Sequence, residues 1–334
     1  MEKLLTIVVP VYNTEKYLPH CLTSLVVPQY MEQLEVLVVI DGSPDNSAKI
    51  AKEYQVKYPQ TFVVIEKENG GHGSAINKGL ELAHGKYFRV LDSDDWFDEN
   101  NFESFLDSLT IETEELIMTH IIREYVSENR SVLWRDKKIE FKYNARYTDL
   151  TILDYLPFDF FAMARCTYKT SRLKEYNLFL LEHRSFEEAF LHIFPLLFIE
   201  SFVFYDKVIY HYFLGRPNQS VRQKVTIKQC NDWRALAKQM IDFYLCNKNK
   251  LSAEKHSFVL RALKQYLNAI YLTLNRLPYR EAQRELHSYN SYITTLPFYP
   301  TIKGLKSTCY NIIPYWVFRT GYSAYVKFRR LLCK

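Results

Sequence analysis

Four short runs of β-branched and aliphatic residues dominate the first hundred positions, and stretches with helical spacing separate them. The runs occupy residues 4–9, 36–40, 62–65 and 87–91. Runs of this length and apolarity are typical of strands buried on both faces of a parallel sheet. Before the last run, Ile76, Leu80 and Ala83 share one face of a helix. Alternation of strand and helix implies right-handed crossovers, so the sequence predicts an α/β sheet with parallel strands.

Each of these four runs is followed by a short polar loop. The loops read PVYN (10–13), DGSPDNS (41–47), EKENGGHGS (66–74) and DSDD (92–95). In an open α/β sheet the loops that follow the strands gather at one edge, where such folds bind ligands. We therefore expect the four loops to line one cleft.

The last loop places three carboxylates, Asp92, Asp94 and Asp95, at the end of a buried strand. Like charges this close repel one another, so water, a helix start or a cation must compensate them. Carboxylates spaced by two residues suit Mg²⁺ or Mn²⁺, which combine one or two protein carboxylates with phosphate oxygens. The alternative is that the aspartates only cap the helix expected next along the chain.

The composition is that of an ordinary globular protein. The chain has 334 residues, of which 48% are hydrophobic and 24% are charged, and this fits one large domain or two smaller ones. Its six cysteines lack ligand-like spacing, so we expect reduced thiols in a cytoplasmic protein. We find no signal peptide and no apolar run of about 18 residues, so no spanning helix is predicted.

Beyond residue 110 the patterns are mixed until long helices begin. Residues 160–168 are typical of a strand, and Arg172 and Leu173 follow in a short helix. Residues 185–198 predict a helix that enters the core, and 202–221 predict two strands around Asp206-Lys207. Long helical patterns then occupy 226–247, 253–274 and 279–293.

Taken together, four stretches resemble the successive motifs of family 2 glycosyltransferases, in the family's order and spacing. They are IVVPVYNTEKYLPHCLTSL, VVIDGSPDNS, NGGHGSAINKGLELAHGKYF and VLDSDDW. The resemblance is close over the first 105 residues and weaker to residue 221, through HRSFEEAF and LGRPNQSV. Among the members of the family, the chain is most similar to the bacterial surface-polysaccharide enzymes.

This resemblance implies a GT-A fold, in which helices flank a Rossmann-like, mixed but mainly parallel sheet and a helical C-terminal region follows. It implies a catalytic domain over residues 1–222, with a nucleotide-sugar half (1–105) and an acceptor half (106–222), and a helical region over 223–334. The expected activity is inverting transfer of a hexose or N-acetylhexosamine from a nucleotide-diphosphate sugar, usually UDP-linked, with Mg²⁺ or Mn²⁺ as cofactor. The expected acceptor is a lipid-linked or protein-linked glycan of surface polysaccharide or glycoconjugate synthesis.

The resemblance assigns the nucleobase to the first two loops. Pro10 and Tyr12 match the loop that flanks the base, and Asp41 matches the base-binding carboxylate after the second strand. The family usually has two acids there, whereas Ile40 precedes Asp41 in this chain. The alternatives are that Tyr12 packs in the fold and that Asp41 caps the following helix.

The third loop is expected to approach the ribose or the sugar. Asn69, Gly70 and Gly71 form a turn in which the glycines leave room for a ligand. Asn77 belongs to the same expected donor site by its place in the family's motif. The family often has an arginine before this asparagine, but here Ile76 stands there, so any contact of that arginine is lost or is supplied elsewhere.

The resemblance also assigns the metal and the base. Asp94 matches the direct metal ligand, Asp92 binds ribose or metal, and His211 is a further candidate for metal or phosphate unless it is structural. At the position of the family's catalytic aspartate the chain has Glu188, so either Glu188 or Glu187 would take the acceptor's proton. The alternative for the two glutamates is that they favour a helix N-terminus.

A last group of donor-site candidates follows a strand in the stretch LGRPNQSVRQ. Arginine binds oxyanions bidentately, which suits a leaving diphosphate. The candidates in this stretch are Arg216, Gln219, Ser220 and Arg222.

The end of the chain mixes basic and aromatic residues. Residues 301–334 hold seven Lys and Arg and no acid, so the basic character of the chain, net +5, belongs to this segment. Such a segment suits peripheral contact with an anionic membrane on its cytoplasmic face, or packing on its own domain or in a homo-oligomer. No recognition module for nucleic acid accompanies it.

Two other functions are compatible with parts of the pattern. A nucleotidyltransferase acting on sugar phosphates would normally show a glycine- and Arg/Lys-rich loop after the first strand, which PVYNTEKY lacks. A binding or scaffold protein could keep the donor pocket and lack turnover, and the departures at Ile76 and Glu188 keep this alternative open.

Overall fold

The computed structural model describes residues 2–134, 140–215, 226–312, 314–315 and 317–321. The chain divides into two compact units. One comprises Met1–Gln223 with Asn249–Lys255, and the other Lys224–Lys248 with His256–Lys334. The boundary predicted between residues 222 and 223 lies in 216–225, outside the described residues.

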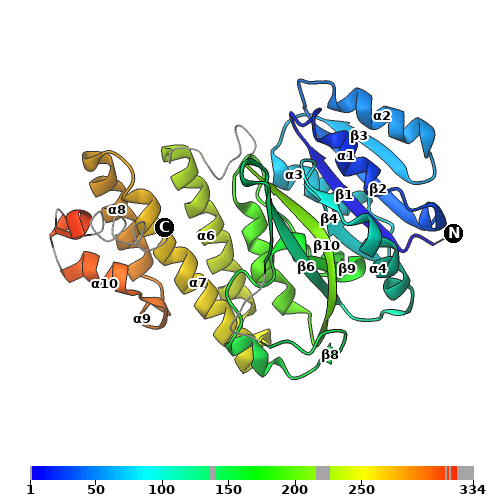
Figure 1. Cartoon of the computed structure of the whole chain (residues 1–334). Helices are drawn as coiled ribbons and strands as arrows, with labels where there is room; N and C mark the ends of the chain where they lie inside the picture. The colour runs from blue at the N-terminus through cyan, green and yellow to red at the C-terminus, as the bar shows by residue number, and fades with distance from the viewer. Residues whose placement is uncertain (1, 135–139, 216–225, 313, 316, 322–334) are drawn as a thin grey trace. The chain divides into compact units, whose positions relative to one another are not determined.

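The first unit is built on a ten-stranded mixed sheet (Figure 1). Eight strands follow the order β3-β2-β1-β4-β9-β6-β10-β5, and in addition β7 pairs with β6 and β8 with β10. Its parallel part consists of β1 (Leu5–Val11), β2 (Leu34–Asp41), β3 (Phe62–Lys67) and β4 (Tyr87–Val90). These are the four strands predicted from sequence. The remaining strands are β5 (Trp96–Phe97), β6 (Leu116–Tyr125), β7 (Arg130–Leu133), β8 (Arg146–Tyr147), β9 (Cys166–Lys169) and β10 (Phe202–Leu214). Since β9 runs antiparallel to both β4 and β6, the sheet is mixed, as expected.

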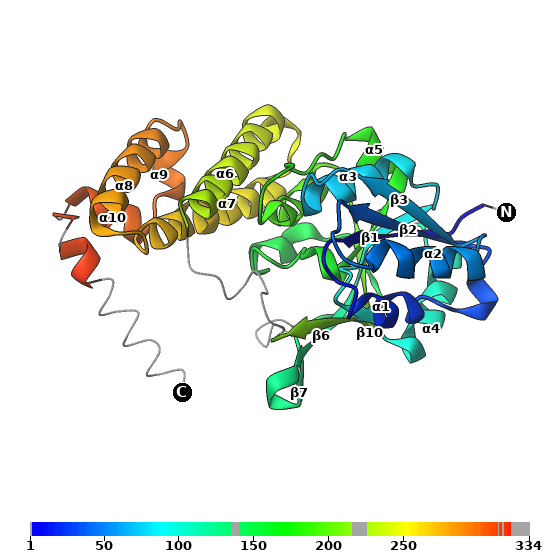
Figure 2. The ribbon, with the colours of Figure 1, turned by 90° about the horizontal axis from the view of Figure 1, so that it is seen from above.

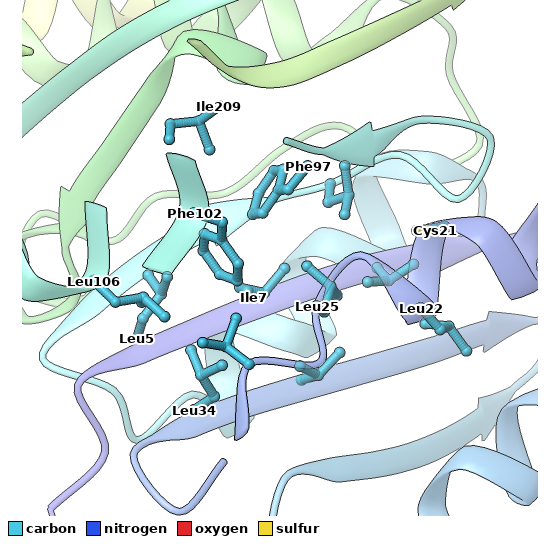
Figure 3. Close-up of a cluster of buried hydrophobic side chains, with 14 of the residues drawn as sticks. Leu5, Ile7, Cys21, Leu22, Leu25, Leu34, Phe97, Phe102, Leu106 and Ile209 are labelled. Carbon is cyan, nitrogen blue, oxygen red and sulfur yellow. The ribbon is translucent and has the colours of Figure 1, made fainter. Parts of the chain in front are cut away.

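Helices cover both faces of this sheet, and Figure 2 shows α3 and α5 on one face and α1 and α4 on the other. The helices of this unit are α1 (Leu18–Thr23), α2 (Ser47–Lys57), α3 (His72–Leu82), α4 (Glu99–Ile111) and α5 (Thr170–Glu175). Side chains of β1 point alternately to the two faces of the sheet, and both faces are covered, so every residue of β1 is buried. Ile7 joins the core with Leu22 and Phe102 (Figure 3), whereas Val8 faces Gly79 of α3.

Three elements differ from the sequence-based expectation. The strand expected over 160–168 is confined to β9, and a 3₁₀ helix, Met163–Arg165, precedes it. The two strands expected in 202–221 are one strand, β10, in which the register shifts between Phe204 and Val208. Asp206 and Lys207 sit in this bulge instead of in a turn, and the Lys207 ammonium donates to the Ser104 carbonyl of α4. The helix expected over 185–198 is two 3₁₀ helices, Glu187–His192 and Phe194–Leu197. Pro195 lacks the N–H that a continuous helix would need.

The second unit is helical, as the spacing of apolar residues predicts. It contains α6 (Ile227–Asn247), most of α7 (Ala253–Leu274), α8 (Tyr279–Thr294), α9 (Tyr299–Ile302) and α10 (Leu305–Ile312). A capping box of Thr226 and Gln229 starts α6, and an ion pair of 2.6 Å between Arg234 and Glu285 ties α6 to α8. None of the helices in the described part of the chain combines the length and apolar character that a membrane span requires.

The described part of the basic aromatic segment packs on its own unit. The Phe318 side chain is buried, and the Arg319 guanidinium donates to the Leu277 carbonyl at 3.0 Å. Most of its basic residues lie in 322–334, outside the described residues. Membrane contact and self-association therefore stay predictions.

The contact between α3 and β1 gives a test of the core. A Cβ at Gly79 would lie 2.4 Å from a methyl carbon of Val8, so Gly79→Ala should lower the free energy of unfolding by about 1–3 kcal/mol. Replacement of an exposed helical glycine by alanine would instead raise the free energy of unfolding by about 0.5–1 kcal/mol. The sign of the change therefore distinguishes a packed from an exposed Gly79. Urea unfolding measures it, with the exposed Glu81→Ala on the same helix as control. A stabilised Gly79→Ala variant would contradict this packing.

Candidate active site

A buried carboxylate at the end of β2 holds the glycine turn that precedes α3. Asp41, 3% exposed, accepts hydrogen bonds from the backbone N–H groups of Gly70 at 2.9 Å and Gly71 at 2.8 Å. Its Oδ1 also pairs with the Lys67 ammonium at 2.8 Å, and its carbonyl accepts from the Asn69 amide at 2.8 Å. Gly71, with φ +87°, is the residue before α3. Asp41 thus organises this turn, and it does not cap α2, which begins at Ser47.

The DSDD turn after β4 is anchored by its last carboxylate. Asp95, 1% exposed, accepts from the Tyr210 hydroxyl at 2.6 Å and from the Phe213 N–H at 2.8 Å. Burial, followed by the charges of Asp94 and Asp92, raises the pKa of Asp95 well above its usual value. Asp95 therefore fixes the turn to β10, and the partly exposed Asp92 and Asp94 are left as candidate ligands.

A histidine joins this turn to the candidate base. His72, the first residue of α3, places Nε2 2.9 Å from Asp92 Oδ1 and Nδ1 2.9 Å from Glu187 Oε1. Burial opposes a charge on the ring, but the contacts with Asp92 and then Glu187 outweigh it and raise the pKa of His72 well above its usual value. Sequence reasoning missed this residue, although it lies inside the quoted NGGHGS motif beside the expected cleft.

The two glutamates occupy different environments. Glu187 is 1% exposed and bonded to His72, whereas Glu188 is partly exposed. Burial, followed by the charge of Glu187, raises the pKa of Glu188 to about 7. Phe186, immediately before them, has φ +71°, a conformation that is strained for a bulky side chain and that recurs at functional sites.

Contacts with the glycine turn and α3 bring the glutamate segment into place. The His183 N–H donates to the Gly70 carbonyl at 2.5 Å. The Asn77 amide bonds both backbone groups of Leu180, at 2.8 and 2.9 Å. A Cβ at Gly73 would lie 2.7 Å from Glu187 Cγ, so only glycine allows this close approach. Asn77 thus has a structural role here, and its contact with a donor stays a prediction.

The other candidates are more scattered. Pro10 is buried in β1, and Tyr12 is 54% exposed at its end, where it is free to meet a ligand. His211 stacks on Trp96, and its ring nitrogens lie 2.7 Å from Glu124 and 3.3 Å from Asp98. Neither of these carboxylates belongs to the predicted metal site. Four candidates lie outside the described residues: Arg216, Gln219, Ser220 and Arg222.

Two sets of side chains have the chemistry of metal ligands. Asp92 and Asp94 offer hard, partly exposed oxygens, which suit Mg²⁺ or Mn²⁺ beside a diphosphate. Within the described ranges, His72, Glu187 and Glu188 also bring ligand atoms within 4.8 Å of one another. In this second set, however, the histidine already hydrogen-bonds a carboxylate through each nitrogen. Asp92 takes part in one of these bonds, but Asp92 and Asp94 offer only hard oxygen ligands, so the aspartate pair suits Mg²⁺ or Mn²⁺ better.

Residues 6–169 match the family model described as glycosyl transferase family 2. This part of the chain, residues 6–169, therefore has the sequence of a family 2 glycosyltransferase domain. The chain is 42% identical over 115 residues to the putative glycosyltransferase EpsH of Bacillus subtilis, covering 34% of this chain and 33% of EpsH. It is 41% identical over 102 residues to the minor teichoic acid biosynthesis protein GgaB of the same organism, covering 30% of this chain and 11% of GgaB. The aligned part thus spans a third or less of these relatives.

A solved structure is similar in fold to nearly the whole chain. The crystal structure of Staphylococcus aureus TarS residues 1–349 in complex with UDP-GlcNAc superposes with a TM-score of 0.69. The superposition covers 96% of this chain and 92% of that one, at 18% sequence identity. It confirms the predicted GT-A fold with a helical C-terminal region.

The environment of Glu188 predicts how stability changes with pH. A carboxyl with a folded-state pKa of about 7, above its unfolded value near 4.5, stabilises the fold when protonated, and this contribution is lost as pH rises between the two values. Glu188→Gln should therefore match wild type near pH 4.5 and exceed it at pH 8 by on the order of 1–3 kcal/mol. Urea unfolding at both pH values checks this.

The exposed Glu53→Gln on α2 provides the matched control for that experiment. It should show the same difference from wild type at both pH values. Equal stability of wild type and Glu188→Gln at pH 8 would contradict the unfavourable environment assigned to the Glu188 carboxylate.

Proposed function

We propose that this protein is an inverting glycosyltransferase that moves a hexose or N-acetylhexosamine from a UDP-sugar to a glycan acceptor. The observation that carries the proposal is the continuous set of contacts from Asp92 through His72 to Glu187, next to the partly exposed Glu188. These contacts join a candidate donor site to a candidate base. A single displacement at an anomeric carbon requires at least a donor site and a base.

Each part of the cleft has a task in this reaction. Tyr12 and the turn held by Asp41 would border the nucleoside, and Asp94 with Asp92 would hold Mg²⁺ or Mn²⁺. When bound, the metal would neutralise charge on the diphosphate leaving group. Glu188 accepts the proton of the acceptor hydroxyl as that oxygen bonds to C1 from the face opposite the departing UDP. The C1–O bond to UDP breaks in the same step, so the configuration inverts.

The environment of Glu188 suits a general base better than the environment of Glu187 does. A base must be reached by the acceptor hydroxyl and must hold the proton once the bond has formed. Glu188 is partly exposed and its pKa is raised to about 7, which favours proton uptake near neutrality. Glu187 is buried and already accepts from His72.

The relatives supply the first donor and acceptor classes to test. TarS was solved with UDP-GlcNAc, so this donor is the first choice within a panel of UDP-hexoses and UDP-N-acetylhexosamines. GgaB is described as a teichoic acid biosynthesis protein, so teichoic-type polymers stand beside lipid-linked glycans as candidate acceptors.

Release of UDP from the donor panel tests the proposal. We expect release from one donor with Mn²⁺ or Mg²⁺, its loss in EDTA, and a decrease of at least about 100-fold in Asp94→Asn, because the leaving group would lack its counter-charge. The control is Asp242→Asn, an exposed aspartate on α6 that pairs only with Lys238 in the described contacts. Metal-independent release, or full activity in Asp94→Asn, would refute the metal site.

Calorimetry with UDP separates the remaining outcomes. UDP binding without release from any donor would favour a scaffold that keeps the pocket and lacks turnover. No binding of UDP or of other nucleoside diphosphates would refute the donor site itself.

A further inference from the structure

His72 is the point at which three segments of the glycosyltransferase domain meet. It begins α3, and its ring lies between Asp92 of the DSDD turn and Glu187 of the segment that carries the candidate base. The reaction proposed above assigns tasks to Asp92 and Glu188 but none to His72. Among the described contacts, the ring joins the donor turn directly to the base segment.

The backbone around His72 fixes where its ring can lie. The left-handed conformation of Gly71 turns the chain into α3, and the Gly71 N–H is held by the buried Asp41 carboxylate. Gly73, one residue after His72, allows Glu187 to approach the helix where any side chain would collide with it. The backbone before His72 is therefore held by Asp41, and Glu187 packs closely against the residue that follows it. Both contacts restrict the position of the ring.

Removal of the ring would leave Glu187 in an unfavourable position. Each ring nitrogen lies 2.9 Å from a carboxylate oxygen, and an ionised carboxylate only accepts, so His72 donates to each partner that is ionised. Glu187 is 1% exposed, and a buried carboxylate that loses its donor carries a large desolvation penalty. Glu188 lies near Glu187, and Asp92 lies across the ring from it, so their charges would add repulsion. The segment would relax most easily at Phe186, whose left-handed backbone is strained, and Glu188 would move with it.

We propose that His72 is a positioning residue whose bridge from Asp92 to Glu187 fixes the Glu188 carboxylate relative to the bound donor. This inference rests on the proposed function, because it assigns Glu188 the task of taking the acceptor's proton. It adds that the donor turn and the base are set by one side chain. Displacement of a reacting group by about 1 Å can cost about 100-fold in rate, so such a bridge has a measurable effect.

The kinetic test compares His72→Ala with Glu187→Ala and with the double variant. We expect His72→Ala to lower the rate of UDP release from the active donor by about 10- to 100-fold while the Kd for UDP changes by less than about threefold. Because both residues act through one contact, the double variant should be no slower than the slower single variant. His72→Gln keeps one donor group and should recover part of the loss, and it replaces His72→Ala if that variant does not fold.

His84→Ala is the matched control. His84 also pairs with a buried glutamate, Glu35, at 2.8 Å, but it lies just beyond the other end of α3, away from the cleft. It should keep the wild-type rate. If both histidine variants lose activity in proportion to a fall in Tm, the effect is one of stability and the proposal is wrong.

Crystal structures of wild type and His72→Ala, both with UDP and Mn²⁺, test the placement without any activity. The Glu188 carboxylate should be displaced in the variant while UDP stays in place. An unmoved Glu188, or an unchanged rate in His72→Ala, overturns the proposal while the proposed function stands. A Mn²⁺ ion coordinated by His72 and Glu187 in the wild type also overturns it. If wild type neither binds UDP nor releases it from any donor, the proposed function fails, and this inference with it.

Discussion

The candidate site depends on one buried carboxylate that satisfies backbone N–H groups. Asp41 ends β2 and accepts from Gly70 and Gly71, so the turn between β3 and α3 has a fixed path over the edge of the sheet. That path sets the first residue of α3, and hence the position of the His72 ring. It also presents the Gly70 carbonyl to His183, which leads the chain toward the two glutamates. The buried carboxylate is tolerated here because two backbone N–H groups and the Lys67 ammonium compensate it.

The carboxylates of the DSDD turn would repel one another, and the fold gives them different partners. Asp95 turns inward to Tyr210 and the Phe213 N–H, so its carboxyl is removed from the cleft and anchors the turn. Asp92 meets the His72 ring, which supplies a hydrogen-bond donor where a lone carboxylate would be repelled by its neighbours. The same three residues that look equivalent in sequence thus have different environments. Helix capping accounts for none of them, because Asp98 caps α4.

Local patterns predicted the parts of this molecule that are set by local physics. The strands of the first hundred residues and the helices α6, α7 and α8 follow from apolar runs and helical spacing. The contact between His72 and Glu187 joins residues 115 positions apart, and no pattern in either segment predicts it. The 3₁₀ character of 187–197 and the bulge at Asp206-Lys207 depend on tertiary contacts and on Pro195, which outweighed the helical and turn patterns.

The adjacent glutamates show why residue type alone leaves the base unassigned. Their chemistry is identical, and the resemblance to the family fits either one. The fold separates them, because Gly73 admits Glu187 to a buried contact with His72, while Glu188, one residue later in a 3₁₀ helix, stays partly exposed. Burial, and then the charge of Glu187, raises the pKa of Glu188. A buried, hydrogen-bonded carboxylate next to a partly exposed one with a raised pKa is the arrangement expected when the first holds the site together and the second exchanges protons.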